Sequence, residues 1–255
     1  MDERIEICRK KINILENHIK LLYERWFVQY DFPDENGNPY KSSGGEMIWN
    51  EIAKKELPTH WNVCTLADLL ILLKDGTHNP PPRIDAGIPL LTGTMFDKNF
   101  LNNEKATFVS YDDYKQIHST YMPLAGDVII TKIGTIGNVN YLREQDVPIA
   151  IHCNSALLRF KKPFDCVFGF SLMKSSLLQK RIKKAKGQSV QEFISLDALG
   201  KIQVEQPSCD LVEKFNKNTA SMLQNMECLS AQIKTLKHIR DWLLPMLMNG
   251  QITVE

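Results

Sequence analysis

Apolar residues at both ends of the chain recur at alternating spacings of three and four. Near the start the pattern runs through Ile5, Cys8, Ile12, Leu15, Ile19, Leu22 and Trp26. Near the end it runs through Val212, Phe215, Thr219, Met222, Met226, Leu229, Ile233, Leu236, Arg240, Leu243 and Leu247, where Thr219 and Arg240 are the polar members. This spacing is the a/d seam of a coiled coil. It predicts a scaffold helix within residues 1–30 and a long coiled-coil helix within 208–250.

Two further features concern these helices. The second helix is expected to end or kink just after Leu244, because Pro245 lacks a backbone N–H and its ring clashes with the preceding turn. The stretches LENHIKLLYERW (15–26) and LSAQIKTLKHIRDW (229–242) also share L-x-x-x-I-K-x-L followed by a tryptophan. Such likeness is expected of a duplicated element and also of unrelated coiled coils, so both interpretations stay open.

Between the two seams the pattern changes to short apolar runs separated by turn residues. Residues 31–56 open with the proline- and glycine-containing stretch DFPDENGNPYKSSGG and are predicted to be a linker. Residues 57–207 are predicted to form one α/β (α+β) domain, a usual size for a single domain. The runs predict strands at Ile88–Leu91, Val128–Thr131, Val139–Leu142, Ile149–Ile151 and Ala156–Phe160, and helices at Leu66–Leu73 and Phe168–Lys184.

The stretch GDVIITKIGTIGNV (126–139) contains two glycines after an apolar run, which suggests a nucleotide-binding loop. That function requires a helix to begin directly after the glycines, whereas Asn138 to Tyr141 favour a strand. The stretch instead predicts a hairpin with a two-residue type II′ turn at Gly134-Thr135. Gly137 then marks a bulge or a close approach of another backbone or a ligand.

The overall composition changes this picture little. With 43% hydrophobic and 24% charged residues the chain resembles an ordinary globular protein, and a net charge of +1 means that any surface for a polyanion is local. The six cysteines form no C-x-x-C pair, which favours reduced thiols over a metal site. No apolar run approaches about 18 residues and the start, MDERIEICRKK, is charged, so we expect a cytoplasmic protein with no membrane contact.

Catalytic motifs are weak. Asn79-Pro80-Pro81 resembles the N-P-P of amino-methyltransferases, where a following aromatic residue stacks on the flipped base, but Pro82 holds that position here. No glycine-rich loop for a methyl donor precedes it, and the aspartates are scattered without a nuclease signature. We therefore expect no catalytic residue, metal or cofactor in this chain. A small DNA amino-methyltransferase using Asn79-Pro80-Pro81 remains the enzymatic alternative.

Side chains suited to DNA are more frequent. The run QKRIKKAKGQS (179–189) is typical of a solvated helix end or of a phosphate-binding surface. Lysine and arginine donate to guanine, asparagine and glutamine pair with adenine, and hydroxyl groups serve either base. The DNA-binding candidates are Lys74, Thr77, His78, Arg83, Thr92, Thr94, Lys132, Gly134, Thr135, Asn138, Lys183, Lys184, Lys186, Gln188 and Ser189.

Several segments resemble the specificity subunit of type I restriction-modification systems. They are WFVQYDFPDENGNPYKSSGG, LPTHW, DGTHNPP, GIPLLTG, GDVIITKIGTIGNV, KGQSVQEFISLDALGKIQVEQP and HIRDWLLPMLMNGQ. The resemblance implies that residues 57–207 are a target recognition domain, which reads half of a split sequence in double-stranded DNA. It also implies that the helices set the spacing and dock methylation subunits, on which S-adenosylmethionine is expected. Whether a restriction subunit joins is left open.

Full-length members of that family carry two recognition domains, whereas this chain carries one. We therefore hypothesise that two copies form a homodimer through their helical seams and read an interrupted palindrome. The expected interface comprises Ile12, Leu15, Ile19, Leu22, Trp26, Met222, Met226, Leu229, Ile233, Leu236 and Leu243. The remaining alternatives are a second chain that supplies the other domain, a silent cassette that supplies sequence by recombination, and a coiled-coil adaptor without a DNA role.

Overall fold

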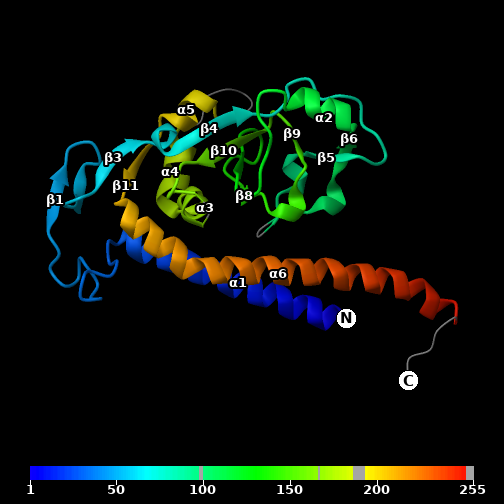
Figure 1. Cartoon of the computed structure of the whole chain (residues 1–255), viewed down its shortest axis with the longest axis horizontal. Coiled ribbons are helices and arrows are strands. Elements are labelled where there is room, and N and C mark those ends of the chain that lie inside the picture. The colour runs from blue at the N-terminus through cyan, green and yellow to red at the C-terminus, as the bar shows by residue number, and fades with distance from the viewer. Residues whose placement is uncertain (98–99, 166, 186–192, 251–255) are drawn as a thin grey trace.

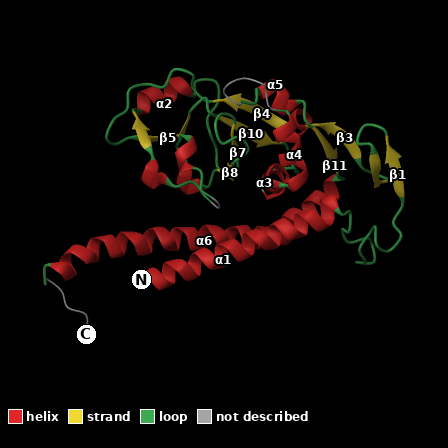
Figure 2. Cartoon of the chain, turned by 180° about the vertical axis from the view of Figure 1, so that it is seen from behind, coloured by secondary structure: helices red, strands yellow, loops and turns green. Residues whose placement is uncertain are grey.

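Two long helices lie side by side and carry a mixed domain of helices and sheets (Figures 1 and 2). They are α1 (Asp2–Tyr23) and α6 (Cys209–Met248), and α1 continues into a π-helical turn at Glu24–Val28. The computed structural model describes residues 1–97, 100–165, 167–185 and 193–250. In these residues no helix has the length and apolar character needed to span a bilayer.

The two helices form an antiparallel pair. Arg240 donates to Asp2 at 2.8 Å at one end, and the rings of Tyr23 and Phe215 lie 5.9 Å apart at the other. Apolar a/d seams bury most surface when they face each other, and Ile12 on α1 is only 2% exposed. The predicted helices are therefore confirmed, but their seams are paired within one chain.

Pro245 does not end the second helix. α6 runs through Pro245 to Met248, so of the two predicted outcomes the end at Leu244 is wrong, and the kink stays a prediction. A proline inside a helix leaves one carbonyl, four residues earlier, without its donor. Here that residue is Asp241, and both Asp241 and Pro245 are exposed, so water can satisfy the carbonyl.

The domain contains two larger sheets and two ribbons. One sheet is antiparallel with the order β4-β10-β7-β8, and the other has the order β6-β5-β9 with β5 and β9 parallel; the ribbons are β1-β2 and β11-β3. The strands are β1 Met47–Asn50, β2 Lys55–Pro58, β3 Asn62–Thr65, β4 Leu70–Asp75, β5 Ile88–Leu91, β6 Thr107–Val109, β7 Val128–Thr131, β8 Val139–Tyr141, β9 Ala150–Ile151, β10 Ser155–Phe160 and β11 Gln203–Gln206. The short helices are α2 Tyr111–Ile117, α3 Val167–Lys174, α4 Ser176–Lys184 and α5 Leu196–Gly200.

The predicted strands are confirmed as β5, β7, β8, β9 and β10 to within about a residue. The predicted helix at Leu66–Leu73 is wrong. Its first turn is a 3-10 helix, Leu66–Leu69, capped by reciprocal bonds between Thr65 and Asp68, and the rest is β4. The backbone of β4 pairs with β10, so the tertiary partner overrides the helix propensity of a leucine run.

The predicted helix at Phe168–Lys184 is present as two helices. Ser175 separates α3 from α4, and its hydroxyl accepts the backbone N–H of Leu178 as the N-cap of α4. A serine in this role starts a helix in a new direction. The change of direction brings α4 across the domain toward β11, where Arg181 reaches Glu205 at 2.7 Å.

The predicted linker, residues 31–56, contains regular structure in its second half. β1 pairs with β2 from Met47 opposite Pro58 to Asn50 opposite Lys55. Part of this ribbon is open to solvent, since Trp49 and Ile52 are each 55% exposed, whereas Leu57 of β2 is 2% exposed and lies in the core. A strand buried on one side shows apolar-polar alternation, and β1 lacks it because the adjacent residues Ile48 and Trp49 are both exposed.

One core joins the helices to the domain. The ring of Phe27 lies 5.0 Å from that of Phe168 on α3 and 5.1 Å from that of Phe215 on α6. Tyr23 and Trp26 complete this aromatic cluster, and all five side chains are at most 5% exposed. Large aromatic side chains contribute much of the burial energy of a core, so the domain is fixed to its helices.

Candidate nucleic-acid interface

The glycine-containing hairpin between β7 and β8 has a longer loop than predicted. Thr131 N donates to Asn138 O at 3.0 Å, so residues 132–137 form the loop and the two-residue turn is wrong. Thr131 Oγ1 donates to the carbonyl of Thr135 and accepts the N–H of Asn138, which fixes the loop from inside. Gly134 has φ +77°, a conformation that glycine adopts without strain.

Gly137 in the same loop marks a close contact, but the approaching group is a side chain of the protein and not the predicted backbone or ligand. A side-chain carbon at this position would come 2.8 Å from Oε1 of Gln179 on α4. Gln179 Nε2 donates to the carbonyls of Gly137 and Met173, at 3.0 and 2.7 Å. The glycine therefore lets α4 hold the hairpin, while Thr135 and Asn138 remain exposed on it.

Lys132, one of the predicted DNA-binding residues, is buried in the structure. Its residue exposure is 6%, and Nζ lies 2.5 Å from Asp75 Oδ1 at the end of β4. A buried ammonium group must keep a compensating carboxylate, because an unpaired buried charge is strongly destabilising. The lysine is thus held inside the domain and is not available to a phosphate in this arrangement.

Three loops meet beside this ion pair. Thr77 follows β4, Thr92 follows β5 and His152 follows β9. Thr77 N donates to Ile151 O at 2.8 Å, and His152 N donates to Leu91 O at 3.3 Å. The structure thus brings together candidates that are separated by many residues in the sequence. Backbone bonds between the loops fix their relative positions.

The other candidates from this region differ in exposure. His78, Arg83 and Lys74 are exposed, and the hydroxyl groups of Thr92 and Thr94 lie 2.9 Å apart. His78 Nε2 lies 3.6 Å from Asp75, the carboxylate that also holds the buried lysine. Hydroxyl, imidazole and guanidinium groups are the donors that base edges and phosphates accept. This group of loops is the strongest candidate for base contact.

His152 belongs to the same group, although it is not among the DNA-binding residues predicted from the sequence. Its Nδ1 accepts the backbone N–H of Asn154 at 3.2 Å, so the neutral ring carries its hydrogen on Nε2 as a donor. Burial, followed by the nearby Arg83 and His78, lowers the pKa of His152 below its usual value. The available signal was its place directly after an apolar run, where a strand was predicted to end.

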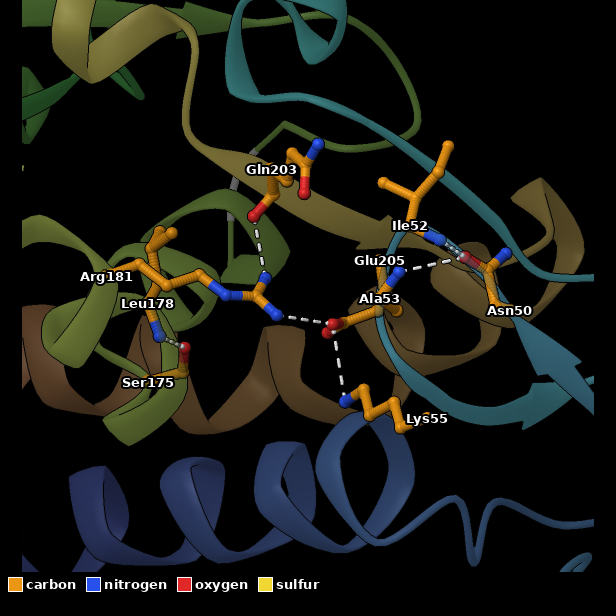
Figure 3. Close-up of polar contacts among 9 residues, drawn as sticks. All are labelled: Asn50, Ile52, Ala53, Lys55, Ser175, Leu178, Arg181, Gln203 and Glu205. Carbon is orange, nitrogen blue, oxygen red and sulfur yellow. Dashed lines mark hydrogen bonds and ion pairs between the residues drawn. The ribbon is translucent and has the colours of Figure 1, made fainter.

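The basic run at the end of α4 lies at a different place. Lys183 and Lys184 are exposed there, whereas Lys186, Gln188 and Ser189 lie outside the described residues. Figure 3 shows that Arg181 is occupied: it donates to Gln203 O at 2.6 Å and to Glu205 at 2.7 Å. An acid on β11 therefore compensates part of this run, which the sequence alone did not reveal.

A groove lies beside these residues, with a volume of about 440 Å³. Lys184 lines the groove, as do Ile52 and Ala53 from the turn between β1 and β2. Glu205, which also lines it, is bonded by both Lys55 and Arg181, as Figure 3 shows. Its carboxylate is satisfied by these two residues, and Lys183 and Lys184 are exposed nearby for a phosphate.

The tripeptide Asn79-Pro80-Pro81 forms an exposed turn. Thr77 Oγ1 accepts the N–H of Asn79 at 3.2 Å and donates to its carbonyl at 3.0 Å, so the residues are held as a local loop. Among the described residues, no group of three or more histidine, cysteine, aspartate or glutamate side chains could hold a metal ion.

Comparison with known proteins decides the family. Residues 58–238, which hold the sheets and most of α6, match the family of the type I restriction modification DNA specificity domain. The chain belongs to this family. The resemblance predicted from sequence is confirmed, and neither a methyltransferase built on Asn79-Pro80-Pro81 nor a coiled-coil adaptor without a DNA role is supported.

Individual relatives agree with this assignment. The chain is 26% identical to the type I restriction enzyme MjaIX specificity subunit of Methanocaldococcus jannaschii, over all of this chain and 56% of the relative. It is 24% identical to the HindI specificity subunit of Haemophilus influenzae, over 77% of this chain and 42% of the relative. The chain therefore spans about half the length of the curated relatives it matches.

A solved structure supports the fold. The S subunit of a type I restriction-modification system from M. genitalium matches 95% of this chain and 56% of its own length, with 21% identity and a TM-score of 0.59. The predicted fold class, a mixed α/β domain flanked by long helices, is confirmed by this likeness and by the arrangement in Figure 1.

The residues predicted for a helical interface lie between α1 and α6 of the same chain. Ile12, Ile19, Trp26 and Met226 are buried in the core, and Leu15, Leu22, Met222, Leu229 and Ile233 pack against it. Leu236 and Leu243 are half-buried near the end of α6. The expectation that both seams stand free for another molecule is thus not met, because each seam is the other's partner.

Proposed function

We propose that this chain is a DNA-reading specificity component of a type I restriction-modification system and has no reaction centre of its own. The match of residues 58–238 to the DNA specificity domain carries the proposal. We further propose that its single described recognition domain reads one half-site of a split sequence in the DNA of the cytoplasm. S-adenosylmethionine then binds to the methylation subunit and not to this chain.

The proposed reading surface is the group of loops around His152. Thr77, His78, Arg83 and Thr92 present donors and acceptors from loops that are bonded to one another, which supports this location. Base discrimination comes from such groups at base edges, whereas contacts to phosphate mainly position the protein. Thr94, Thr135 and Asn138 extend the surface, and Lys183 and Lys184 are proposed to contact phosphates.

A methylation subunit is proposed to dock on the outer face of α1. Ile7, Ile14 and Leu21 recur there every seven residues and are 45%, 54% and 65% exposed. A basic residue follows each of them by four positions: Lys11, His18 and Arg25. An apolar stripe bordered by basic side chains fits a helix with an apolar stripe bordered by carboxylates.

A second copy is proposed to pair through the last turns of α6. Trp242, Leu244 and Met248 are 58%, 52% and 79% exposed, beyond the point where Arg240 meets Asp2. Exposed apolar groups of this size mark contact surfaces. Most of the predicted seam is buried within the chain, whereas its last member, Leu247, is 38% exposed in these turns.

The test is selection of binding sites from duplexes with a randomised centre, followed by titration at several salt concentrations. The chain should select a half-site and bind it with an affinity that falls steeply with salt. Arg83→Ala should relax the preference at about one base position, whereas Lys183→Ala with Lys184→Ala should weaken binding to all duplexes and flatten the salt slope. Recovery of no preferred sequence, with a slope near zero, would contradict the proposed function.

A further inference from the structure

A buried ion pair lies directly beneath the proposed reading loops. Lys132 Nζ and Asp75 Oδ1 are 2.5 Å apart, and their side chains are 7% and 23% exposed. Asp75 ends β4 and Lys132 follows β7, so the pair joins two strands that are separated in the sheet by β10. The backbone carbonyl of Asp75 also accepts the hydroxyl of Tyr121 at 2.6 Å, which fixes this end of β4 further.

Lys132 is also a junction for the backbone of two other segments. Its N–H donates to Asn154 O at 2.7 Å, in the turn that carries His152. Its carbonyl accepts the N–H of Ile194 at 3.0 Å. The side chain and backbone of one residue therefore tie together the end of β4, the turn before β10 and the chain that follows α4.

We infer that the Asp75–Lys132 pair is a positioning element for base reading and that Lys132 itself does not touch DNA. The inference rests on the proposed function. It adds a buried residue that affects base specificity by positioning the reading loops and not by contact with DNA. Thr77 and His78 begin two residues after Asp75, and His152 lies two residues before Asn154. A shift of either strand end would move these side chains relative to one another.

The physical basis is that base readout requires the contacting side chains to be positioned accurately. Groups that discriminate between bases must be held within about 0.5 Å of their working positions. Backbone bonds hold the loops to one another, and the Asp75–Lys132 pair adds a constraint between the ends of β4 and β7, across the intervening strand β10. Its loss should therefore change which bases are preferred more than it changes attraction to phosphate, which depends on exposed cations.

The experiment compares Lys132→Met with the unmodified chain. Methionine keeps most of the length of lysine and removes its charge. The matched control is Lys54→Met, which removes a lysine from an exposed ion pair with Glu51 in the turn between β1 and β2. Each protein is used to select sites from the randomised duplexes, and the affinities for the selected half-site and its single-base variants are measured at several salt concentrations.

For Lys132→Met we expect the ratio of affinities between the selected half-site and its single-base variants to fall about tenfold. The salt slope should stay that of the unmodified chain, and Lys54→Met should match the unmodified chain in both measurements. A salt slope lowered by about one with the preference kept would identify Lys132 as a phosphate contact and overturn the inference. An unchanged ratio together with an unchanged slope would overturn it as well.

A second variant covers the case in which Lys132→Met does not fold, because it leaves Asp75 partly buried without its partner. Asp75→Asn combined with Lys132→Met removes both charges and avoids an unpaired buried ion. If this folded double variant keeps the full preference, the inference is wrong. If the unmodified chain and Lys54→Met themselves select no sequence, the proposed function fails instead, which separates the two results.

Discussion

His118 shows how a single residue supports the reading loops. It lies at the end of α2 and is 2% exposed, and its Nε2 accepts the backbone N–H of Ile151 at 3.2 Å. That bond holds the short strand β9, whose next residue is His152. Burial lowers the pKa of His118 from 6.5 to about 4, so the ring is neutral in the folded protein at neutral pH.

The pKa of His118 predicts a dependence of stability on pH. In the unfolded chain this histidine takes up a proton below about pH 6.5, whereas in the folded protein it does so only near pH 4. The stability that the neutral, buried ring of His118 contributes to the folded protein is thus fully present above pH 6.5. This stability is lost as the pH falls toward 4, by up to about 3 kcal/mol. His118→Gln should remove this part of the pH dependence.

Free energies of unfolding from urea titrations at pH 4.5 and pH 7 measure this difference. The matched control is His60→Gln, at an exposed histidine, which should keep the pH dependence of the unmodified chain. An equal loss of stability between the two pH values in His118→Gln and the unmodified chain would show that another group is responsible.

At the scale of elements, sequence patterns located the strands best where burial is one-sided or complete. β7 and β10 read as apolar runs because nearly all their residues are buried, and both were predicted within a residue. The helix predicted from the leucine run at residues 66–73 is wrong, because the second part of this run forms a strand through its pairing with β10. The burial of Lys132 could not be predicted for a similar reason: nothing local indicates that Asp75 lies across the sheet.

The outer face of α1 predicts where a methylation subunit binds. Ile14→Glu places a carboxylate in the centre of the exposed stripe, where it breaks the apolar contact. We expect the affinity for the methylation subunit of the same system to fall at least about tenfold, because a central interface residue is replaced. Binding of this chain alone to its selected DNA half-site should not change, since α1 lies on the far side of the domain from α5 and β4 (Figure 1).

The matched control is Ile52→Glu, because Ile52 is 55% exposed and Ile14 is 54% exposed. Co-purification and titration by calorimetry measure both variants. If Ile52→Glu weakens the complex while Ile14→Glu does not, the subunit binds at the ribbon β1-β2 and the assignment of the α1 face is wrong.

At the scale of the whole molecule, the domain has a fixed position on its helices. Arg143 is 6% exposed, donates to Asp146 at 2.7 Å and also donates to Ser230 Oγ of α6 at 2.6 Å. Tyr141 adds a bond to Glu227 at 3.0 Å. Because these contacts join the sheet to α6, any partner that holds α6 also sets the position of the reading loops. Spacing between two half-sites would then be a property of the helical assembly.

The exposed end of α6 predicts self-association of this chain. In a twofold dimer each copy presents the same surface, so Trp242 and Leu244 of two copies would cover one another. Sedimentation equilibrium should show a mass that rises with concentration from 29.3 kDa toward twice that value. Trp242→Glu should raise the dissociation constant of the dimer by at least about tenfold, because buried tryptophans dominate interface energies.

Trp49→Glu is the matched control, since Trp49 is similarly exposed at 55% but lies on the ribbon β1-β2, and it should leave the association intact. A constant monomer mass at all concentrations, in the presence and absence of the selected duplex, would mean that the second half-site is read by a different chain.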